Sequence, residues 1–293
     1  MAGGKWSFEA VFVYRMGAHH SGLDDTCSPI LFLKGNRDMQ QSLSENVRGC
    51  TVGVIHIAGG ILFFKNRDLA REYLINRTTT FQSTPDIHTL KGANLKTAEL
   101  EGVSIGVNRH KVCVANTHVV STTDVTYDVL CERLVTEAQK REDVPRIVKD
   151  FMKHQTVQGG RILVSSPEWT YLIEVFKDVF EMDEIEGNFV MTNTFSLIPH
   201  QAEGPDALLA SSANRLEVAS RMIKSISSIN ALKSMLRSHI PDKGDLSICN
   251  HRQDGGGTES SHIIRIQGDQ TDWSSSIGFP CENDYHTIQL FQT

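Results

Sequence analysis

The chain has 293 residues, of which 40% are hydrophobic and 22% are charged, a composition typical of a folded globular protein. Its formal net charge of -6 argues against a broad nucleic-acid-binding surface. No apolar run approaches the roughly 20 residues needed to span a bilayer, so we expect no membrane segment.

The cysteine and histidine residues give little sign of a bound metal. The six cysteines are scattered and include no Cys-x-x-Cys pair, which favours reduced thiols in the cytoplasm over a disulfide framework. The adjacent His19 and His20 lie in a polar stretch, where histidines are usually solvated. The first residues do not lead into a secretory apolar core, because Glu9 and Arg15 interrupt it. We therefore predict a cytoplasmic protein with no metal and no cofactor.

Residues 1–49 are predicted to pack against the rest of the chain. Two apolar runs, 8–14 and 29–33, are typical of strands. One interpretation is a pro-segment that covers a nucleophile until the chain cuts itself. The other is a permanent N-terminal hairpin in the same sheet as the rest of the domain. The sequence leaves both interpretations open.

The strongest local signal is a hairpin that begins just after Cys50. Two runs rich in β-branched and aromatic residues, 52–58 and 61–68, flank Gly59-Gly60. Because the two ends of a hairpin lie side by side, we expect Cys50 to neighbour the charged residues at 65–68. A thiol beside cations and a carboxylate is placed where it would be activated as a nucleophile.

Hairpins and helices alternate along the remaining chain. Residues 69–100 are polar and weakly patterned, which predicts loops with one short helix. Runs of strand character lie at 101–107, 112–116, 161–166, 169–175, 179–186, 188–194, 246–251, 258–267 and 286–292. Helical spacing of apolar residues is found at 124–140, 145–152, 207–228 and 229–239.

Several motifs together resemble the N-terminal nucleophile (Ntn) hydrolases. The resemblance is to the group of penicillin V acylases, choloylglycine (bile-salt) hydrolases and acyl-CoA:isopenicillin N acyltransferases, and it covers roughly residues 50–267. Gly49-Cys50-Thr51 matches the form in which the acyltransferases cut their own precursor. Thr192-Asn193 resembles the group's Thr-Asn-(Ser/His) step, with Thr194 in third place, and Ser211 to Arg215 matches a Ser-x-x-x-Arg run.

The resemblance implies an α+β fold, a four-layer αββα sandwich of two mainly antiparallel sheets flanked by helices. Residues 1–49 would be a pro-segment, autocleaved or retained, and residues 50–293 the catalytic domain. The implied activity is hydrolysis or transfer of an acyl group from a linear amide or thioester, after autocatalytic cleavage of a zymogen at Gly49-Cys50. The substrate would be a small acyl amide or an acyl-CoA-like molecule. The resemblance is compatible with a homo-oligomer.

The resemblance also assigns roles to individual residues. Cys50 would be the thiol nucleophile, and its freed α-amino group the general base. Asp68 would orient that amine. Asn116, after the hairpin at 101–116, and Asn193 would stabilise the oxyanion.

Charge around the thiol would come from basic residues. Arg215 would favour the thiolate. The group usually has Arg-Asn-x-Asp before the aspartate, whereas this chain has Lys65-Asn66-Arg67-Asp68, so the nearby cation is either Lys65 or Arg67.

Two alternatives remain at this stage. A Cys50–His251 pair could act as a cysteine hydrolase without self-cleavage. The chain could also be a non-catalytic protein that keeps the fold with residues 1–49 in place.

Overall fold

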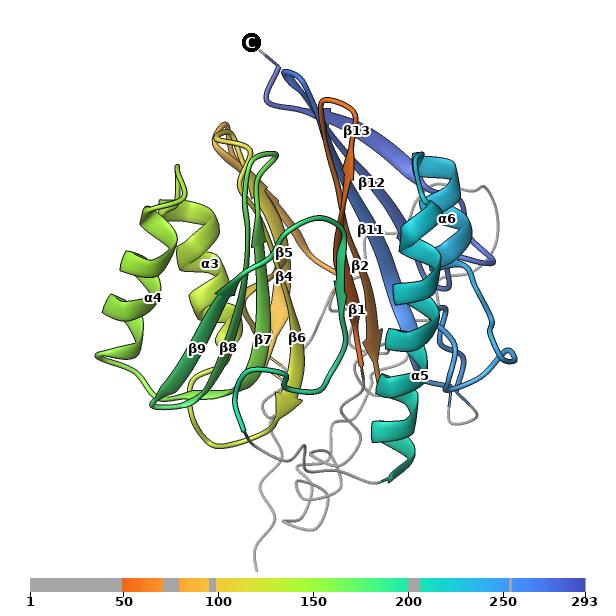
Figure 1. Cartoon of the computed structure of the whole chain (residues 1–293), viewed down its shortest axis with the longest axis horizontal. Coiled ribbons are helices and arrows are strands. Elements are labelled where there is room, and N and C mark those ends of the chain that lie inside the picture. Colours follow the sequence, from red (N-terminus) through yellow and green to blue (C-terminus); the bar gives the residue numbers. More distant parts are fainter. Residues whose placement is uncertain (1–48, 71–78, 95–98, 200–205, 253–254, 293) are drawn as a thin grey trace, which may run out of the picture.

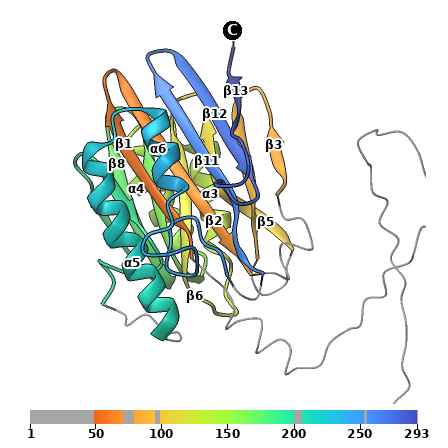
Figure 2. The same ribbon diagram turned by 90° about the vertical axis from the view of Figure 1, so that its right-hand side faces the viewer.

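The computed structural model describes residues 49–70, 79–94, 99–199, 206–252 and 255–292. Within these ranges two antiparallel sheets stack face to face, and helices cover both outer faces (Figure 1). The layer order is helix, sheet, sheet, helix, and Figure 2 looks onto one outer helical layer, with the strands behind it. The predicted four-layer sandwich is confirmed. The strands expected at 8–14 and 29–33 lie outside the described residues.

The first sheet carries the predicted hairpin. Its six strands run in the order β10-β1-β2-β11-β12-β13. Thr51 pairs with Asn66 and Val52 with Lys65, so the start of β1 lies beside the charged end of β2, as expected. The bounds are β1 Thr51–Ile57, β2 Gly60–Leu69, β10 Phe189–Met191, β11 Gly257–Gln267, β12 Gln270–Ile277 and β13 His286–Leu290.

The second sheet is an antiparallel meander of seven strands in chain order. Its strands are β3 Phe81–Ser83, β4 Ile87–Ala93, β5 Leu100–Asn108, β6 Cys113–Val120, β7 Val157–Ser165, β8 Thr170–Lys177 and β9 Val179–Glu184. The prediction of loops over 69–100 was therefore wrong for β3 and β4. Buried polar residues such as His88 and Thr89 obscure the strand pattern of β4.

The helices lie where apolar spacing predicted them. They are α3 Tyr127–Glu137, α4 Asp143–Met152, α5 Asp206–Met222 and α6 Ile229–Leu236, with a 3₁₀ turn at Ile223–Ser225. Side-chain caps define two starts: the Thr126 hydroxyl accepts from the backbone N–H of Asp128, and Ser228 accepts from Ala231. Among the described residues, none of the helices combines the length and apolar character needed to cross a membrane.

Strand β2 separates two apolar cores. Phe63 belongs to the core between the sheets, whereas Phe64 packs against α5 and α6. Because side chains alternate along a strand, Lys65 and Arg67 face the other sheet, and Asp68 faces the helices. This alternation divides the charged residues of the predicted site into two groups.

Two further expectations need correction. Residues 246–251 were predicted as a strand, but His251 forms only an isolated bridge with Gly257 and the rest is irregular. Strand β12 was not predicted, because its serine-rich sequence has low strand propensity; pairing with β11 and β13 holds it in the sheet.

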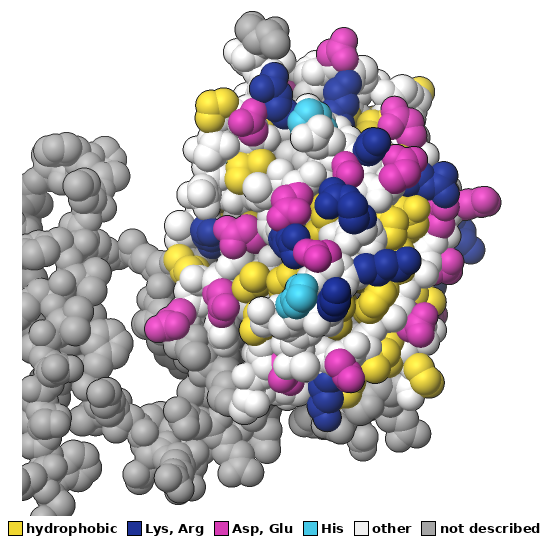
Figure 3. All heavy atoms as spheres, turned by 90° about the vertical axis from the view of Figure 1, so that its left-hand side faces the viewer, with side chains coloured by type: hydrophobic (Ala, Val, Ile, Leu, Met, Phe, Trp, Pro, Cys, Tyr) yellow, Lys and Arg dark blue, Asp and Glu magenta, His cyan; other side chains and the backbone are white. Residues whose placement is uncertain are grey.

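The face formed by α3 and α4 carries interspersed acidic and basic side chains (Figure 3). Arg133 pairs with Asp150 at 2.7 Å, and Arg141 pairs with Glu184. Exposed pairs of this kind typically contribute about 0–1 kcal/mol each. They add little to the stability that the buried cores provide.

Candidate active site

Cys50 lies at the start of β1, where the two sheets and α5 meet. Its side chain is 8% exposed and belongs to the core between the sheets. The guanidinium of Arg215, from α5, donates to the carbonyl oxygen of Cys50 at 2.8 Å and to the hydroxyl of Thr51 at 3.1 Å. The candidate nucleophile and the candidate arginine are thus brought together.

Asn193 lies beside the same guanidinium. Its Oδ1 accepts from Nη2 of Arg215 at 3.1 Å, and its Nδ2 donates to the carbonyl oxygen of His118 at 2.7 Å. The backbone N–H of Asn193 donates to the Ser212 hydroxyl at 3.0 Å. These bonds hold the carboxamide in one orientation and leave one of its two N–H groups for another acceptor.

Gly49 packs directly against these two side chains. A methyl group at its Cα would collide with the guanidinium of Arg215 and with Oδ1 of Asn193. Only a residue without a side chain fits here. The bond between Gly49 and Cys50 is therefore lined by the guanidinium and the carboxamide that the sequence motifs singled out.

Asp68 lies on the helix-facing side of β2, fully buried. Its Oδ1 accepts from the Thr258 hydroxyl at 2.8 Å. Its Oδ2 is 4.0 Å from Nη1 of Arg215 and has no hydrogen-bond partner among the described residues. Burial raises the pKa of Asp68 to about 7, although Arg215 and the Thr258 hydrogen bond act in the opposite direction.

Thr258 reaches Asp68 because β11 is irregular at this point. The pairing with β2 shifts between Thr258 and Ser260, so that Thr258 lies opposite Asp68 and Ser260 opposite Arg67. The extra residue between them, Glu259, marks a β-bulge.

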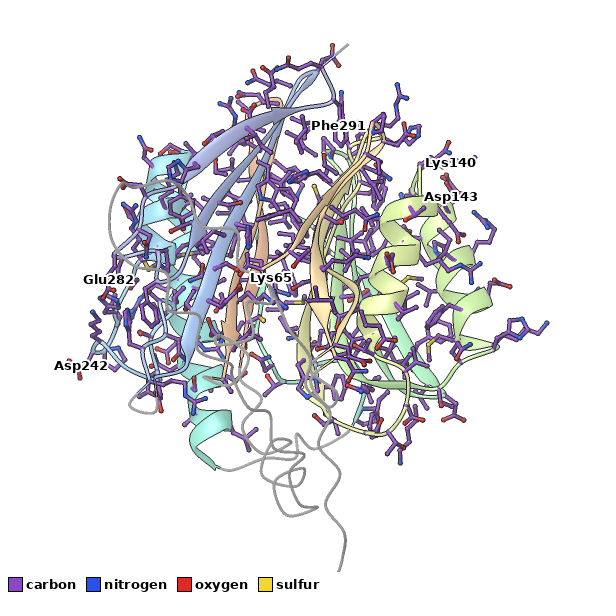
Figure 4. The ribbon with its side chains drawn as sticks, turned by 180° about the vertical axis from the view of Figure 1, so that it is seen from behind. Lys65, Lys140, Asp143, Asp242, Glu282 and Phe291 are labelled. Atoms are coloured by element: carbon purple, nitrogen blue, oxygen red, sulfur yellow. The ribbon has the colours of Figure 1, made fainter. Side chains whose placement is uncertain are left out.

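Lys65 occupies the space between the two sheets (Figure 4). Its ammonium donates to the hydroxyl of Ser104 at 2.7 Å, to the Ser104 carbonyl oxygen at 3.1 Å and to Oδ1 of Asn116 at 3.0 Å. Burial lowers the pKa of Lys65, and the ionised form of Cys50 raises it, which indicates that the two groups interact.

Asn116 is buried and fully engaged. Its Nδ2 donates to the carbonyl oxygen of Val103 and to Oδ1 of Asp128, both at 2.9 Å, and contacts Sγ of Cys131 at 3.2 Å. The oxyanion role predicted for Asn116 would therefore require this amide to rearrange. In the described arrangement Asn116 orients Lys65. Burial raises the pKa of Asp128 to about 6.

Arg67 lies on the same face of β2 as Lys65, and Nη1 of Arg67 is 3.7 Å from Oε2 of Glu259. Both candidate cations are thus buried near the thiol.

A buried ion pair that sequence reasoning missed holds the loop after β10. Nε of Arg161 is 2.8 Å from Oε1 of Glu174, and Nη1 reaches the carbonyl oxygen of Thr192 at 3.4 Å. Glu174 also accepts from the backbone N–H groups of Ser196, Leu197 and Ile198. The signal for this pair was a glutamate inside the apolar run of β8. The pair fixes the segment that carries Asn193.

His251 lies among other thiols. Its Nε2 is 3.4 Å from Sγ of Cys249 and 3.2 Å from Sγ of Cys281. Its ring stacks on Phe279 with 3.9 Å between the ring centroids. These contacts are with sulfurs other than that of Cys50, so the alternative Cys50–His251 pair receives no support.

The fold is similar to that of penicillin V acylase from Agrobacterium tumefaciens, with a TM-score of 0.50 and 8% identity over 82% of this chain and 86% of that one. It is also similar to a variant of conjugated bile acid hydrolase from Clostridium perfringens, with a TM-score of 0.46 and 11% identity over 82% and 92% of the two chains. No protein-family model and no curated protein sequence matches this chain. The chain thus has the fold of penicillin V acylase, the four-layer sandwich that the resemblance predicted.

Proposed function

We propose that this chain is a cysteine Ntn hydrolase that cleaves or transfers the acyl group of a linear amide or thioester through a thioester on Cys50. Residues 1–49 serve as a pro-segment, and residues 50–293 form the catalytic domain once the Gly49-Cys50 bond is cut. The observation that carries this proposal is the buried Oδ2 of Asp68, which lies behind the guanidinium that holds the Cys50 carbonyl and accepts no hydrogen bond from the part of the chain that the structure describes.

A buried carboxylate oxygen without a hydrogen bond is costly, by about 1–3 kcal/mol or more for a charged group. Cutting the chain before Cys50 would release an ammonium group close to this oxygen. The ammonium would supply the missing partner and favour the ionised carboxylate. Asp68 would then orient the amine that serves as general base.

Self-cleavage would proceed in two steps. The sulfur of Cys50 attacks the carbonyl carbon of Gly49, the C–N bond breaks, and the thiol proton passes to the departing α-amine. Water then hydrolyses the Gly49 thioester, which frees the thiol and leaves a carboxylate on Gly49. The guanidinium of Arg215 lies against Gly49, which supports its assignment to stabilising the oxyanion. Asn193 turns its Oδ1 towards Gly49 and would contribute through its second N–H group.

Turnover would use the same groups on a substrate carbonyl. The α-amine of Cys50 accepts the thiol proton and returns it to the leaving group. Asn193 and Arg215 stabilise negative charge on the substrate oxygen, and Lys65, held by Asn116, adds positive charge from the space between the sheets. Arg67 contributes further positive charge on that face.

We propose a small acyl amide or acyl-CoA-like thioester as the acyl donor and water or an amine as the acceptor. That the substrate carries an acyl group is supported by the fold shared with penicillin V acylase. The five cysteines within the described ranges are free thiols, which supports the proposal of a reducing, cytoplasmic location.

Intact-mass analysis of the purified full chain tests the proposal. We expect loss of residues 1–49 and a new N-terminus at Cys50, whereas the Cys50→Ala protein stays at full length. Cys113→Ala is the matched control, because it removes another buried thiol of the same core and should leave processing unchanged.

The processed protein should then hydrolyse members of an amide panel and react at Cys50 with a thiol-reactive acyl analogue. If the chain stays uncut but is active through Cys50, the proposed hydrolase activity holds and the proposed self-cleavage is wrong. An uncut chain without activity or labelling would leave only a non-catalytic protein with this fold.

A further inference from the structure

Four metal-binding side chains converge at a corner of the molecule beside α6. One ligand atom from each of His239, Cys249, His251 and Cys281 lies within 4.8 Å of the others. Glu282, next to Cys281, marks this corner in Figure 4, on the α6 side and away from Lys65. The cluster is separate from the candidate active site.

We propose that His239, Cys249, His251 and Cys281 bind one zinc ion in a closed, four-ligand structural site. Two thiolates and two imidazoles in tetrahedral arrangement are the donor set that selects zinc over the hard cations. Four protein ligands leave no open position for substrate, which distinguishes a structural site from a catalytic one.

The distances suit a zinc ion. Zinc bonds of about 2.0–2.3 Å in a tetrahedron place neighbouring ligand atoms roughly 3.3–3.8 Å apart. Nε2 of His251 is 3.4 Å from Sγ of Cys249 and 3.2 Å from Sγ of Cys281. All four ligand atoms lie within 4.8 Å of one another, so shifts of up to about 1 Å would admit the ion.

A second observation points to a ligand. Nε2 of His239 is buried and has no hydrogen-bond partner among the described residues. A buried nitrogen of this kind is costly unless something binds it. In the proposed site the imidazole nitrogen of His239 coordinates the metal, which removes the cost.

The backbone around the cluster is already held in place without a metal. The N–H of Cys249 donates to the Ser238 carbonyl oxygen at 3.0 Å, which joins the segment of Cys249 to that of His239. The guanidinium of Arg237 donates to the carbonyl oxygen of Pro280 at 2.7 Å, which positions the segment of Cys281. Three chain segments are thus aligned before any ion binds.

The proposed zinc site is connected to the candidate active site by hydrogen bonds. The backbone N–H of Asn250, between two of the ligands, donates to the Thr258 hydroxyl at 2.9 Å. That hydroxyl donates to Asp68 at 2.8 Å. A bound metal would therefore stabilise the segment that positions Thr258 against the carboxylate. The metal site itself does not depend on the proposed enzymatic function.

Metal analysis of the full chain, expressed with added zinc and purified under reducing conditions, tests this proposal. We expect about one zinc per chain, and a thiolate-to-metal charge-transfer band when cobalt replaces zinc. Cys249→Ser combined with Cys281→Ser should abolish the band and the zinc content. Cys113→Ala, a thiol outside the cluster, should retain both.

His239→Ala removes a single ligand, and it replaces the double variant in the test if the double variant does not fold. Outer-shell partners alone are worth about 10- to 100-fold in affinity. Loss of a ligand should therefore weaken zinc binding by more than this in a chelator competition. The parent chain is decisive by itself: failure to bind zinc or cobalt would overturn the proposal. A Cys249–Cys281 disulfide in the reduced preparation, or zinc retained by the double variant, would overturn it as well.

Discussion

The guanidinium of Arg215 donates to the carbonyl oxygen of Cys50 at 2.8 Å, although the two residues are 165 positions apart in the chain. The same group lies 4.0 Å from Asp68 and bonds to Asn193 at 3.1 Å. One side chain thus joins the backbone at the nucleophile, the buried carboxylate and the carboxamide. The following predictions test this arrangement.

Arg215→Met should destabilise the protein by about 3 kcal/mol above pH 7, because it leaves the buried carboxylate of Asp68 without its cation. The loss should be smaller at pH 5, where Asp68, with a pKa of about 7, is protonated. Urea unfolding at the two pH values measures the difference. Arg221→Met, an exposed arginine on the same helix, should show no such pH dependence. Equal destabilisation at both pH values would contradict the ion pair.

Gly49→Ala should slow self-cleavage by at least about tenfold, because the added methyl group displaces Arg215 and Asn193. A time course of intact mass measures the rate. Gly244→Ala is the control: a methyl group there meets no atom closer than 3.9 Å. Cleavage at the parent rate in Gly49→Ala would show that the close packing at Gly49 does not serve the reaction.

Asn193→Ala should lower kcat of the processed enzyme by about 100-fold, the effect of removing one oxyanion donor worth about 3 kcal/mol. KM should change little, since the interaction strengthens in the transition state. Steady-state kinetics separates the two constants. Asn230→Ala, an exposed asparagine on α6, should be neutral. A rise in KM at constant kcat would assign Asn193 to substrate binding instead.

The uncut Cys50→Ala protein should lose stability as the pH rises from about 4 to about 7. Asp68 has its pKa raised from 3.8 to about 7, so the folded state holds a proton that the unfolded state has released in this window. At about 1.4 kcal/mol per pH unit, the loss attributable to Asp68 is up to about 4 kcal/mol. The same measurement on the Cys50→Ala protein carrying Asp68→Asn isolates this contribution. Parallel stability curves for the two proteins would argue against a raised pKa.

Lys65→Met should lower stability and impair catalysis. Loss of the ammonium leaves the buried Oδ1 of Asn116 without its donor, which costs about 1–3 kcal/mol. Loss of the positive charge near Cys50 should reduce kcat/KM by 10-fold or more, as for other groups that stabilise charge in a transition state. A tenfold loss corresponds to about 1.4 kcal/mol of activation free energy. Thermal unfolding and kinetics on one preparation separate the two effects. Unchanged activity would reduce Lys65 to a structural role.

Local pattern predicted much of the fold. The Gly59-Gly60 turn between apolar runs identified the β1–β2 hairpin, and apolar spacing located the four helices. Strands β4 and β12 escaped prediction, because their polar residues are buried by packing between the sheets, as where His88 of β4 contacts Trp273 of β12. Pairing partners, not local propensity, decide such strands.

For the candidate site too, local sequence patterns predicted some contacts and not others. The hairpin alone predicted that Cys50 and the end of β2 are neighbours. No local signal placed Arg215 or Asn193 beside them, so those expectations rested on the family resemblance. The four-residue cluster with His239 was missed, because its members are spread over three segments and only Cys249-x-His251 is a short-range pattern.

The β-bulge at Glu259 reverses which face of the sheet the residues of β11 point to. Thr258 has the same parity as Ser260 and His262, which face the interior between the sheets, yet it lies opposite Asp68 on the helix-facing side. Because of this one extra residue, β11 presents Ser260 to the space between the sheets and Thr258 to the side covered by the helices. If Glu259 instead paired in register, Thr258 would lie opposite Leu69 and face the space between the sheets, away from the carboxylate.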